Sequence, residues 1–224
     1  MRIASFDAAD TLIGLKEPVP VVYQSHAARL GITSDTRALG DRLKATFGSL
    51  PPPDYPDFSS GEEAERVWWR TLVFEAFAHR PGQSPRQDRV FSQLFDDLWD
   101  HYAQPEAWFL YEDTLPALEA ARDRTDRLVV VSNFDSRLFP LLDHFGVTDF
   151  FDLIVNSAAV RSRKPDPGIF LHTLNLLNAS PADCFHVGDN HLNDVQGARA
   201  AGLNAFHLTR PTKSLLDFVA TLPQ

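Results

Sequence analysis

Carboxylate side chains follow two short apolar runs of the sequence. Asp7 comes directly after Ile3–Phe6, and Asp189 comes two residues after Phe185–Val187, with Asp194 five residues further along. A carboxylate can attack phosphorus or carbon and form a covalent intermediate, and carboxylate oxygens are hard ligands for Mg²⁺. Several carboxylates gathered without a cation would repel one another. The pattern therefore indicates nucleophilic catalysis, a divalent metal site, or both.

A hydroxyl, an amide and a lysine are further candidates for contact with an anion. The apolar run Leu128–Val131 ends in Ser132 and Asn133, and Lys164 opens a Lys-Pro-Asp-Pro sequence. Ser132 and the adjacent backbone amide can donate hydrogen bonds to a transferring phosphoryl group, and Lys164 can supply a point charge to its oxygens. Taken alone, Ser132-Asn133 is more typical of a turn that ends a strand, and Lys164 of a solvated lysine before a helix.

Short apolar runs that stop abruptly in polar or glycine-bearing turns predict the strands that must position these residues. They are Ile3–Phe6, Leu128–Val131 and Phe185–Val187, with Leu153–Val155 and Ala205–Leu208 as weaker candidates. From about residue 112 onward the strands alternate with helical patterns, which predicts a parallel sheet covered on both faces. Ligands bind beyond the carboxyl ends of the strands in such a sheet, where Asp7, Ser132 and Asp189 are expected.

Two expected helices begin at residues of these polar segments. Asp166 and Pro167 predict an N-cap followed by proline at the first helical position. Asn193 or Asp194 is expected to open another helix, which closes at Gly202. Asp194 therefore has a structural interpretation, as a helix cap, beside its chemical one.

The stretch from residue 16 to residue 108 has a different pattern. It contains no convincing strand, and its apolar residues recur with the spacing of amphipathic helices, most cleanly from Val90 to Tyr102. We therefore expect an α/β protein. Its core is a doubly wound, Rossmann-like parallel sheet built from residues 1–15 and 109–224, and an inserted all-helical cap spans 16–108.

Four segments, in this order, resemble the motifs of the haloacid dehalogenase superfamily of hydrolases. They are Phe6-Asp7-Ala8-Ala9-Asp10-Thr11-Leu12, Val131-Ser132-Asn133, Arg163-Lys164-Pro165-Asp166-Pro167 and Gly188-Asp189-Asn190-His191-Leu192-Asn193-Asp194. The resemblance covers essentially the whole chain, including the inserted cap. A closer similarity, to the subfamily named haloacid dehalogenase-like hydrolase domain-containing protein 3, rests on Ser132-Asn133-Phe134-Asp135, Lys164-Pro165-Asp166-Pro167 and His186-Val187-Gly188-Asp189-Asn190.

The resemblance implies catalytic roles for Asp7, Ser132 and Lys164, and substrate binding by Ser132, Asn133 and Lys164. Asp7 stands at the position of the family nucleophile, and Ser132, Asn133 and Lys164 stand where the family binds the transferring phosphoryl group. It implies a phosphatase that acts on a small phosphorylated metabolite through an aspartyl-phosphate intermediate.

The resemblance also implies a metal cofactor. The family's Mg²⁺ ligands fall on Asp7, the backbone carbonyl of Ala9 and Asp189, with Asp194 as a further ligand or a supporting partner.

Ala9 is the position at which the chain departs from the family pattern. Phosphatases of the superfamily carry a second aspartate two residues after the nucleophile, which protonates the leaving alcohol and activates the hydrolytic water. Here Ala9 has only a methyl group, and Asp10 is one residue further on, where an extended chain directs its side chain elsewhere. We therefore expect weakened activity, since a lost general acid–base removes about 10²–10⁴ in rate. Whether Asp10 substitutes is left open.

Three alternatives follow from this departure. Phosphonate-cleaving members are similar in having alanine there, but they need a cap lysine, and Lys16 and Lys44 are the candidates. A protein that kept its metal and phosphate sites without its acid–base group could be a phosphate-ligand binding or regulatory protein. Haloacid dehalogenation is disfavoured, because that branch works without metal and lacks the Gly188-Asp189 pattern.

Composition limits the classes of partner. The chain has 224 residues and a formal net charge of −9, which argues against binding nucleic acid or an anionic membrane surface. The single Cys184 excludes an internal disulfide, and His186, inside a predicted strand, is interpreted as a hydrogen-bonded core residue. No signal-peptide or membrane-spanning pattern is present, so we expect a soluble cytoplasmic protein, either a monomer or a homodimer.

Overall fold

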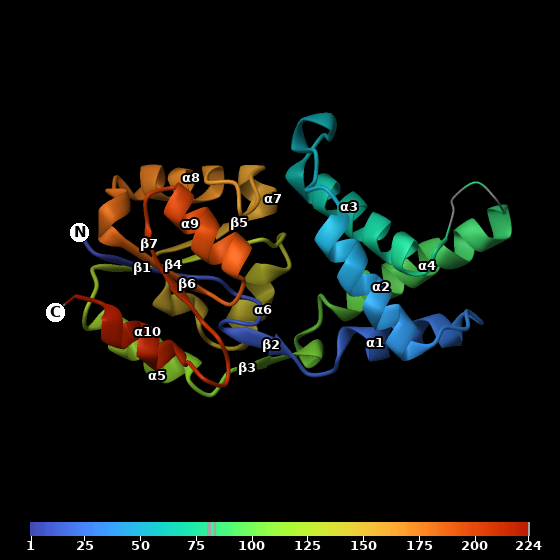
Figure 1. The fold of residues 1–224 in the computed structure, drawn as a ribbon, viewed down its shortest axis with the longest axis horizontal. Coiled ribbons are helices and arrows are strands. Elements are labelled where there is room, and N and C mark those ends of the chain that lie inside the picture. The colour runs from blue at the N-terminus through green and yellow to red at the C-terminus, as the bar shows by residue number, and fades with distance from the viewer. Residues whose placement is uncertain (80–81, 83, 224) are drawn as a thin grey trace. The chain divides into compact units, whose positions relative to one another are not determined.

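The computed structural model describes residues 1–79, 82 and 84–223. The chain forms two compact units (Figure 1). The first consists of Met1–Gly14, Ser60–Glu62 and Phe109–Gln224, and the second of Leu15–Ser59 and Glu63–Trp108. Residues 60–62 thus group with the first unit, although they lie inside the range expected for the cap.

The first unit is built on a five-stranded sheet in the order β5-β4-β1-β6-β7. Every neighbouring pair in this sheet is parallel. The strands are β1 (Ile3–Phe6), β4 (Arg127–Ser132), β5 (Leu153–Asn156), β6 (Cys184–Gly188) and β7 (Asn204–His207). The predicted doubly wound parallel sheet is confirmed, and all five expected strands are present in the described part of the chain.

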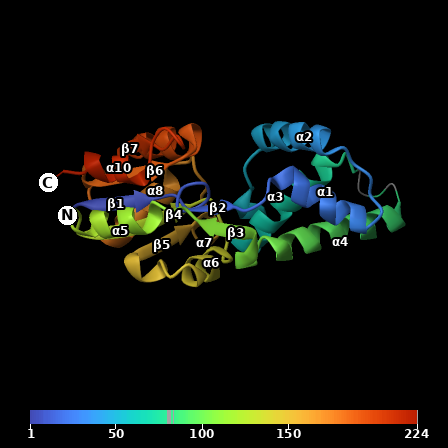
Figure 2. The ribbon, with the colours of Figure 1, turned by 90° about the horizontal axis from the view of Figure 1, so that it is seen from below.

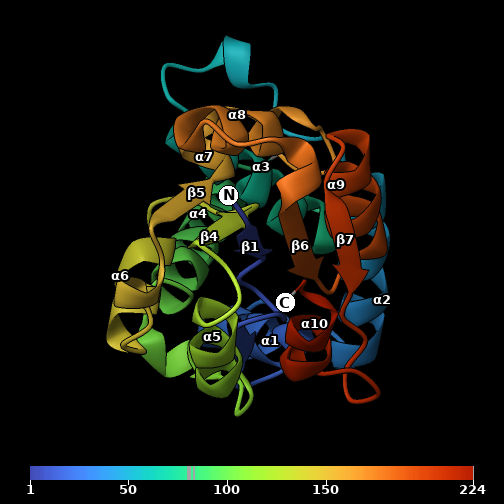
Figure 3. The same cartoon turned by 90° about the vertical axis from the view of Figure 1, so that its left-hand side faces the viewer.

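Helices cover both faces of this sheet, with α8 on one side and α5 and α10 on the other (Figure 3). The helices of the first unit are α5 (Thr114–Arg122), α6 (Leu138–His144), α7 (Ser157–Val160), α8 (Gly168–Leu177), α9 (Gly197–Ala200) and α10 (Leu215–Thr221). Short 3-10 turns of this unit lie at Thr148–Phe150 and Pro181–Asp183.

Strand β1 shows how the two faces differ. Successive side chains of a strand point to opposite faces. Phe6 meets Phe218 of α10, with ring centroids 5.5 Å apart, while Ile3 packs in the cluster that contains Phe170 of α8. Ser5 therefore points to the α8 face, where an apolar residue would be expected.

Two helix starts differ from the sequence prediction. Helix α8 begins at Gly168, one residue after the predicted Pro167, and the side chain of Asp166 accepts the backbone N–H of Gly168 at 2.6 Å, as expected of the predicted capping residue. A π-helical turn, His191–Gln196, precedes α9, so the start predicted at Asn193 or Asp194 is wrong. Asn190 is the cap instead, because its side-chain oxygen accepts the backbone N–H groups of the turn's second and third residues.

The second unit consists of helices with their own apolar core (Figure 2). The helices are α1 (Val19–Arg29), α2 (Thr36–Ser49), α3 (Gly61–Ala76), whose first two residues group with the first unit, and α4 (Pro85–His101), with 3-10 turns at Tyr55–Asp57 and Pro105–Ala107. Leu39, Leu72 and Leu94 are among the residues buried in this core. Two of the connections to the first unit run through β2 (Ile13–Leu15) and β3 (Trp108–Leu110), which pair with each other, and the chain also passes between the units on either side of residues 60–62.

No helix among the described residues is both long enough and apolar enough to cross a bilayer.

Candidate active site

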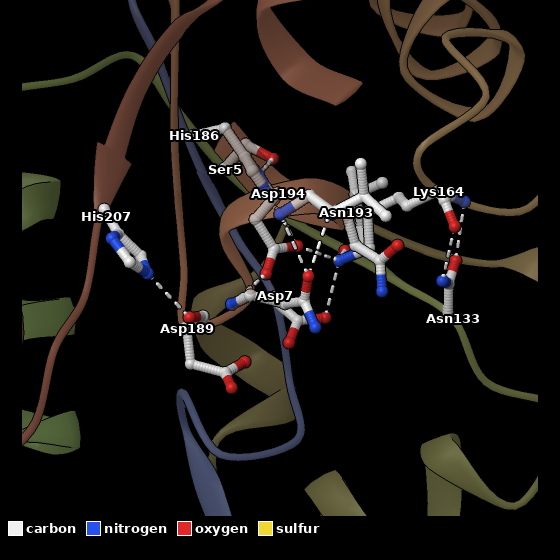
Figure 4. Close-up of polar contacts among 12 residues, drawn as sticks. Ser5, Asp7, Asn133, Lys164, His186, Asp189, Asn193, Asp194 and His207 are labelled. Atoms are coloured by element: carbon white, nitrogen blue, oxygen red, sulfur yellow. Dashed lines mark hydrogen bonds and ion pairs between the residues drawn. The ribbon is translucent and has the colours of Figure 1, made fainter. Parts of the chain in front are cut away.

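The carboxyl ends of the parallel strands bring the predicted site residues together (Figure 4). Asp7 directly follows β1, Ser132 ends β4, and Asp189 directly follows β6. Asp7 and Ser132 are buried, and Asp189 is half-buried. Ligand atoms of Asp7, Asp189 and Asp194 all lie within 4.8 Å of one another. Residues more than 180 positions apart in the chain thus meet in one cluster.

Lys164 is buried among these carboxylates. Its Nζ donates to Asp7 Oδ1 at 2.7 Å, to Asp194 Oδ1 at 2.5 Å and to the carbonyl of Val131 at 2.9 Å. An ammonium has three N–H donors, so each of them has an acceptor. Burial disfavours the charged form, but the charges of Asp194 and Asp7 outweigh this effect and raise the pKa of Lys164. Lys164 is therefore a fixed positive charge beside Asp7.

Asn133 holds the backbone of Lys164. Its side-chain oxygen accepts the Lys164 N–H at 2.7 Å, and its side-chain nitrogen donates to the Lys164 carbonyl at 2.9 Å. The side chain predicted to bind substrate is therefore engaged within the protein. The prediction that Asn133 contacts the substrate therefore applies to its backbone N–H.

Asp194 has both carboxylate oxygens engaged. Oδ1 accepts from Lys164 and lies 3.3 Å from His186 Nε2, and Oδ2 accepts the backbone N–H of Asn190 at 2.9 Å. Burial acts to raise the pKa of Asp194, but Lys164 and His186 outweigh it and hold this pKa well below its usual range. Of the two roles predicted for Asp194, this geometry favours the supporting one.

Asp7 and Asp189 carry the negative charge that Lys164 does not balance. Burial raises the pKa of Asp7, with Lys164 opposing it and Asp194 adding to it. Burial, together with the charges of Asp7 and Asp194, raises the pKa of Asp189 to about 7. A divalent cation would relieve this repulsion, and hard carboxylate oxygens are the donors that Mg²⁺ prefers. The donor set therefore fits Mg²⁺.

The backbone hydrogen bonds within the turn after Asp7 do not include the carbonyl of Ala9. The backbone N–H groups of Thr11, Leu12 and Ile13 all donate to the carbonyl of Ala8. The carbonyl that the family pattern assigns to the metal thus takes no part in these bonds. Its availability does not depend on the missing side chain at Ala9.

Asp10 lies in the same turn with a φ of 56°, in the left-handed region. Desolvation and the charge of Asp7 raise the pKa of its carboxyl. The residue is exposed, and its backbone N–H donates to the carbonyl of Ile13 at 2.7 Å. The structure supports the interpretation of Asp10 as a turn residue.

Two histidines belong to the site although sequence reasoning did not place them there. His186 lies between Ser5 and Asp194, and His207 Nε2 donates to the carbonyl of Asp189 at 2.9 Å. His186 is the hydrogen-bonded core residue that was expected, but its partner is a site carboxylate. The sequence shows a polar residue in the middle of an apolar run, which signals a buried polar contact. It does not show which residue that contact is made with.

Comparison with known proteins gives the same family as the motifs. Residues 1–202 match the model of a hydrolase family described as haloacid dehalogenase-like hydrolase. A haloacid dehalogenase-like hydrolase domain-containing protein 3 from Bos taurus is 32% identical over 94% of this chain and 83% of its own length.

Solved structures share the fold at lower identity. A phosphatase from Thermococcus onnurineus aligns with a TM-score of 0.65 and 23% identity over 99% of this chain and 98% of its own. A 2-haloacid dehalogenase from Pseudomonas syringae gives 0.59 and 22% over 96% and 89%. A hydrolase from Bacillus subtilis, solved with bound magnesium, gives 0.63 and 18% over 95% and 90%. At this level of identity the structures establish similarity of fold, and they include more than one chemistry.

Proposed function

Because this chain belongs to the haloacid dehalogenase-like hydrolases, we propose that it is a Mg²⁺-dependent phosphatase of a small phosphorylated metabolite. The observation that carries the proposal is the contact of 2.7 Å between Lys164 Nζ and Asp7 Oδ1. It fixes a carboxylate at the carboxyl end of the sheet and leaves its second oxygen for attack. The buried hydroxyl residue Ser132 lies at the end of the neighbouring strand, where it can donate to a phosphoryl oxygen.

The reaction proceeds in two displacements on phosphorus. In the first, a carboxylate oxygen of Asp7 attacks phosphorus, the bond from phosphorus to the ester oxygen breaks, and that oxygen leaves with the bonding electrons. In the second, water attacks the aspartyl phosphate, the bond from phosphorus to the Asp7 oxygen breaks, and the water's proton passes to solvent. Inorganic phosphate and the free Asp7 carboxylate result. Lys164 balances charge on the phosphoryl oxygens in both steps.

Asp7, Asp189 and the Ala9 carbonyl would hold Mg²⁺ in this proposal, with Asp194 supporting them through Lys164. When bound, the ion supplies positive charge to the phosphoryl oxygens. The raised pKa of Asp189, about 7, supports the assignment, because burial and the neighbouring charges of Asp7 and Asp194 both disfavour a carboxylate there without a cation. The magnesium named for the Bacillus subtilis structure supports it by analogy of fold.

Ala9 limits the activity that we propose. The methyl group cannot protonate a leaving alcohol, so the proton must come from solvent. Acidic leaving groups depart without a proton, so esters that carry them should react fastest. Weak hydrolysis of alkyl phosphates and efficient hydrolysis of aryl or acyl phosphates is therefore the expected profile.

Ala9 is also the observation that favours a second candidate, a phosphate-ligand binding or regulatory protein. Such a protein would keep the Lys164 and carboxylate cluster for binding and would turn over no ester. Cleavage of a phosphonate C–P bond also tolerates alanine at this position, and it requires a lysine from the inserted segment.

A substrate screen separates these functions. Aryl, acyl and alkyl phosphates, a phosphonoaldehyde and a 2-haloacid are assayed with and without Mg²⁺, for release of phosphate or halide. Hydrolysis of aryl and acyl phosphates that needs Mg²⁺ and disappears in Asp7→Asn supports the proposal. Binding of phosphate without turnover assigns the binding function, and halide release without metal assigns dehalogenation.

A further inference from the structure

Ser5 and His186 form a buried polar pair in the middle of the sheet. They lie opposite each other in register on the neighbouring strands β1 and β6, and both are 0% exposed. Ser5 Oγ lies 2.8 Å from His186 Nδ1, and His186 Nε2 lies 3.3 Å from Asp194 Oδ1 (Figure 4). Burial of a hydroxyl and an imidazole costs free energy that apolar side chains would not cost. Packing alone therefore does not account for this pair.

The hydrogen-bond partners determine which ring nitrogen of His186 carries the proton. A carboxylate with low pKa only accepts, so the proton that faces Asp194 must be on Nε2. Nδ1 of the neutral ring is then an acceptor, and the hydroxyl of Ser5 supplies the hydrogen. Burial lowers the pKa of His186 against the opposing effect of Asp194, which is consistent with a neutral ring. Asp194 therefore selects the Nε2–H tautomer, and the Ser5 hydroxyl satisfies Nδ1 of that tautomer by donating to it.

Asp194 connects His186 to Asp7, the proposed nucleophile, through Lys164. Its Oδ1 accepts from both His186 and Lys164, and Lys164 uses another donor on Asp7. The His186 contact on Oδ1 acts together with the Asn190 backbone N–H on Oδ2 to limit rotation of the Asp194 carboxylate about its side-chain bond. A carboxylate free to rotate would draw the Lys164 ammonium away from the position in which it also contacts Asp7.

We propose that His186 is a positioning residue: it donates from Nε2 to Asp194, with Ser5 donating to its Nδ1, and so orients Asp194 and, through Asp194, Lys164 beside Asp7. The effect on rate rests on the proposed phosphatase function, whereas the tautomer and the contacts do not. Partners of this kind around a reactive site typically contribute about 10–100-fold to activity or metal affinity.

Three variants and one control test the proposal. His186→Leu removes both ring nitrogens, Ser5→Ala removes only the donor to Nδ1, and His186→Gln keeps one donor and one acceptor. Thr173→Val is the control, because Thr173 is a buried polar residue of α8 whose hydroxyl donates only locally, to the carbonyl of Ile169 at 2.9 Å. Each variant is measured for kcat and KM with an aryl phosphate and Mg²⁺, and for thermal unfolding.

Nitrogen NMR of the histidine rings is the second measurement, and it does not require activity. The wild-type protein should show His186 protonated on Nε2. Ser5→Ala should keep this tautomer but shift the Nδ1 resonance, because Nδ1 loses its hydrogen-bond donor. We expect kcat to fall about tenfold in His186→Leu and less in Ser5→Ala, with KM unchanged and His186→Gln close to wild type. Thr173→Val should lower the unfolding temperature without a change in kcat.

Two results would overturn the proposal: protonation of His186 on Nδ1 in the wild type, or wild-type kcat in a folded His186→Leu. A kcat that tracks unfolding temperature across all four variants would also overturn it, because the role would then be only structural. If His186→Leu does not fold, Ser5→Ala and the NMR spectra still decide. If the wild type hydrolyses no phosphate, the proposed function fails, and the tautomer alone decides the positioning claim.

Discussion

The buried charges of the site do not balance. The Lys164 ammonium faces the carboxylates of Asp7 and Asp194 directly, and Asp189 completes the cluster within 4.8 Å. Burial removes the water that would otherwise screen three negative charges against one positive charge. Asp189 responds most clearly, with its pKa raised to about 7. We therefore expect the site to take up either a proton or a cation more readily than an isolated aspartate does.

The free energy of unfolding of the metal-free protein should depend on pH because of Asp189. Since its pKa is about 7 in the folded protein and 3.8 in the unfolded reference, the folded state holds a proton that the unfolded chain releases. The free energy of unfolding should therefore fall as pH rises from 4 to 7, by at most about 4 kcal/mol at 1.36 kcal/mol per pKa unit. Urea unfolding in EDTA between pH 4 and 8 measures this change in the free energy of unfolding.

The matched variant for this measurement is Asp189→Asn, which has no proton to lose at this position. The lowered pKa of His186 acts with the opposite sign below pH 6.5, so the quantity to compare is the difference between wild type and variant. That difference should shrink as pH falls. A constant difference across the range would contradict the assignment of the raised pKa to Asp189.

Ala9→Asp should restore part of the missing acid–base catalysis. A carboxyl group two residues after Asp7 can protonate a leaving alcohol, so hydrolysis of alkyl phosphates should rise by at most about 10²–10⁴. Aryl phosphates should gain much less, and Asp7→Asn should abolish the gain. The added carboxylate also increases repulsion with Asp7 and Asp189, which Mg²⁺ must offset. If wild type already hydrolyses alkyl and aryl phosphates equally well, another group carries the proton, and Asp10 is the first candidate.

The connection from β6 into the π-helical turn His191–Gln196 positions Asp194. The Asn190 side chain accepts the first N–H groups of the turn, and the Asn190 backbone N–H donates to Asp194 Oδ2. π-helical turns often occur at functional sites, because they place a side chain where a regular helix would not. Here the turn brings a buried carboxylate against the backbone of Gly188 at the end of the strand.

Gly188→Ala should displace Asp194. A Cβ at Gly188 would lie 2.2 Å from Asp194 Cγ and 2.3 Å from Oδ2, far inside contact distance. The Asp194 carboxylate must then move away from Lys164. We expect the free energy of unfolding to fall by about 1–3 kcal/mol and the activity to fall with it. Gly48→Ala is the control, because no atom outside its chain neighbours and the backbone of its own helix, α2, lies within 4 Å of its Cβ position. The control should stabilise the protein by about 0.5–1 kcal/mol. Equal stability and activity in both variants would show that Asp194 is not held in this way.

The whole molecule carries a net charge of −9 and has a separate apolar core in each of its two units. A cation can therefore stabilise it in two ways, by general screening or by binding at the cluster of Asp7, Asp189 and Asp194. Only the second depends on the identity of the ion and on single carboxylates.

Mg²⁺ at 100 times its Kd should raise the free energy of unfolding by about 2.7 kcal/mol, because it binds the folded state and not the unfolded chain. NaCl at the same ionic strength should raise it much less. Asp189→Asn should weaken Mg²⁺ binding in calorimetry while its circular dichroism spectrum remains that of the wild type. Unchanged affinity in this variant would place the metal elsewhere.

The strands and the residues at their ends could be predicted because both depend on local sequence. A short apolar run that stops at Asp7, Ser132 or Gly188 forms a buried strand wherever the sheet places it. Parallel pairing then gathers the carboxyl ends at one edge of the sheet. Helix starts were less predictable, because several adjacent residues can cap a helix and the structure uses Asn190 where Asn193 or Asp194 was expected.

The contacts inside the site were decided by tertiary structure alone. Ser5 meets His186 across 181 positions because β1 and β6 are neighbours in register, and Lys164 meets Asp7 across 157 positions because a loop is held by Asn133. No local pattern encodes strand register or the packing of one loop on another. The sequence by itself determined the carboxylates, the hydroxyl and the lysine of the site. The fold decided that His186 and His207 join them, and which of these groups share a charge or a hydrogen bond.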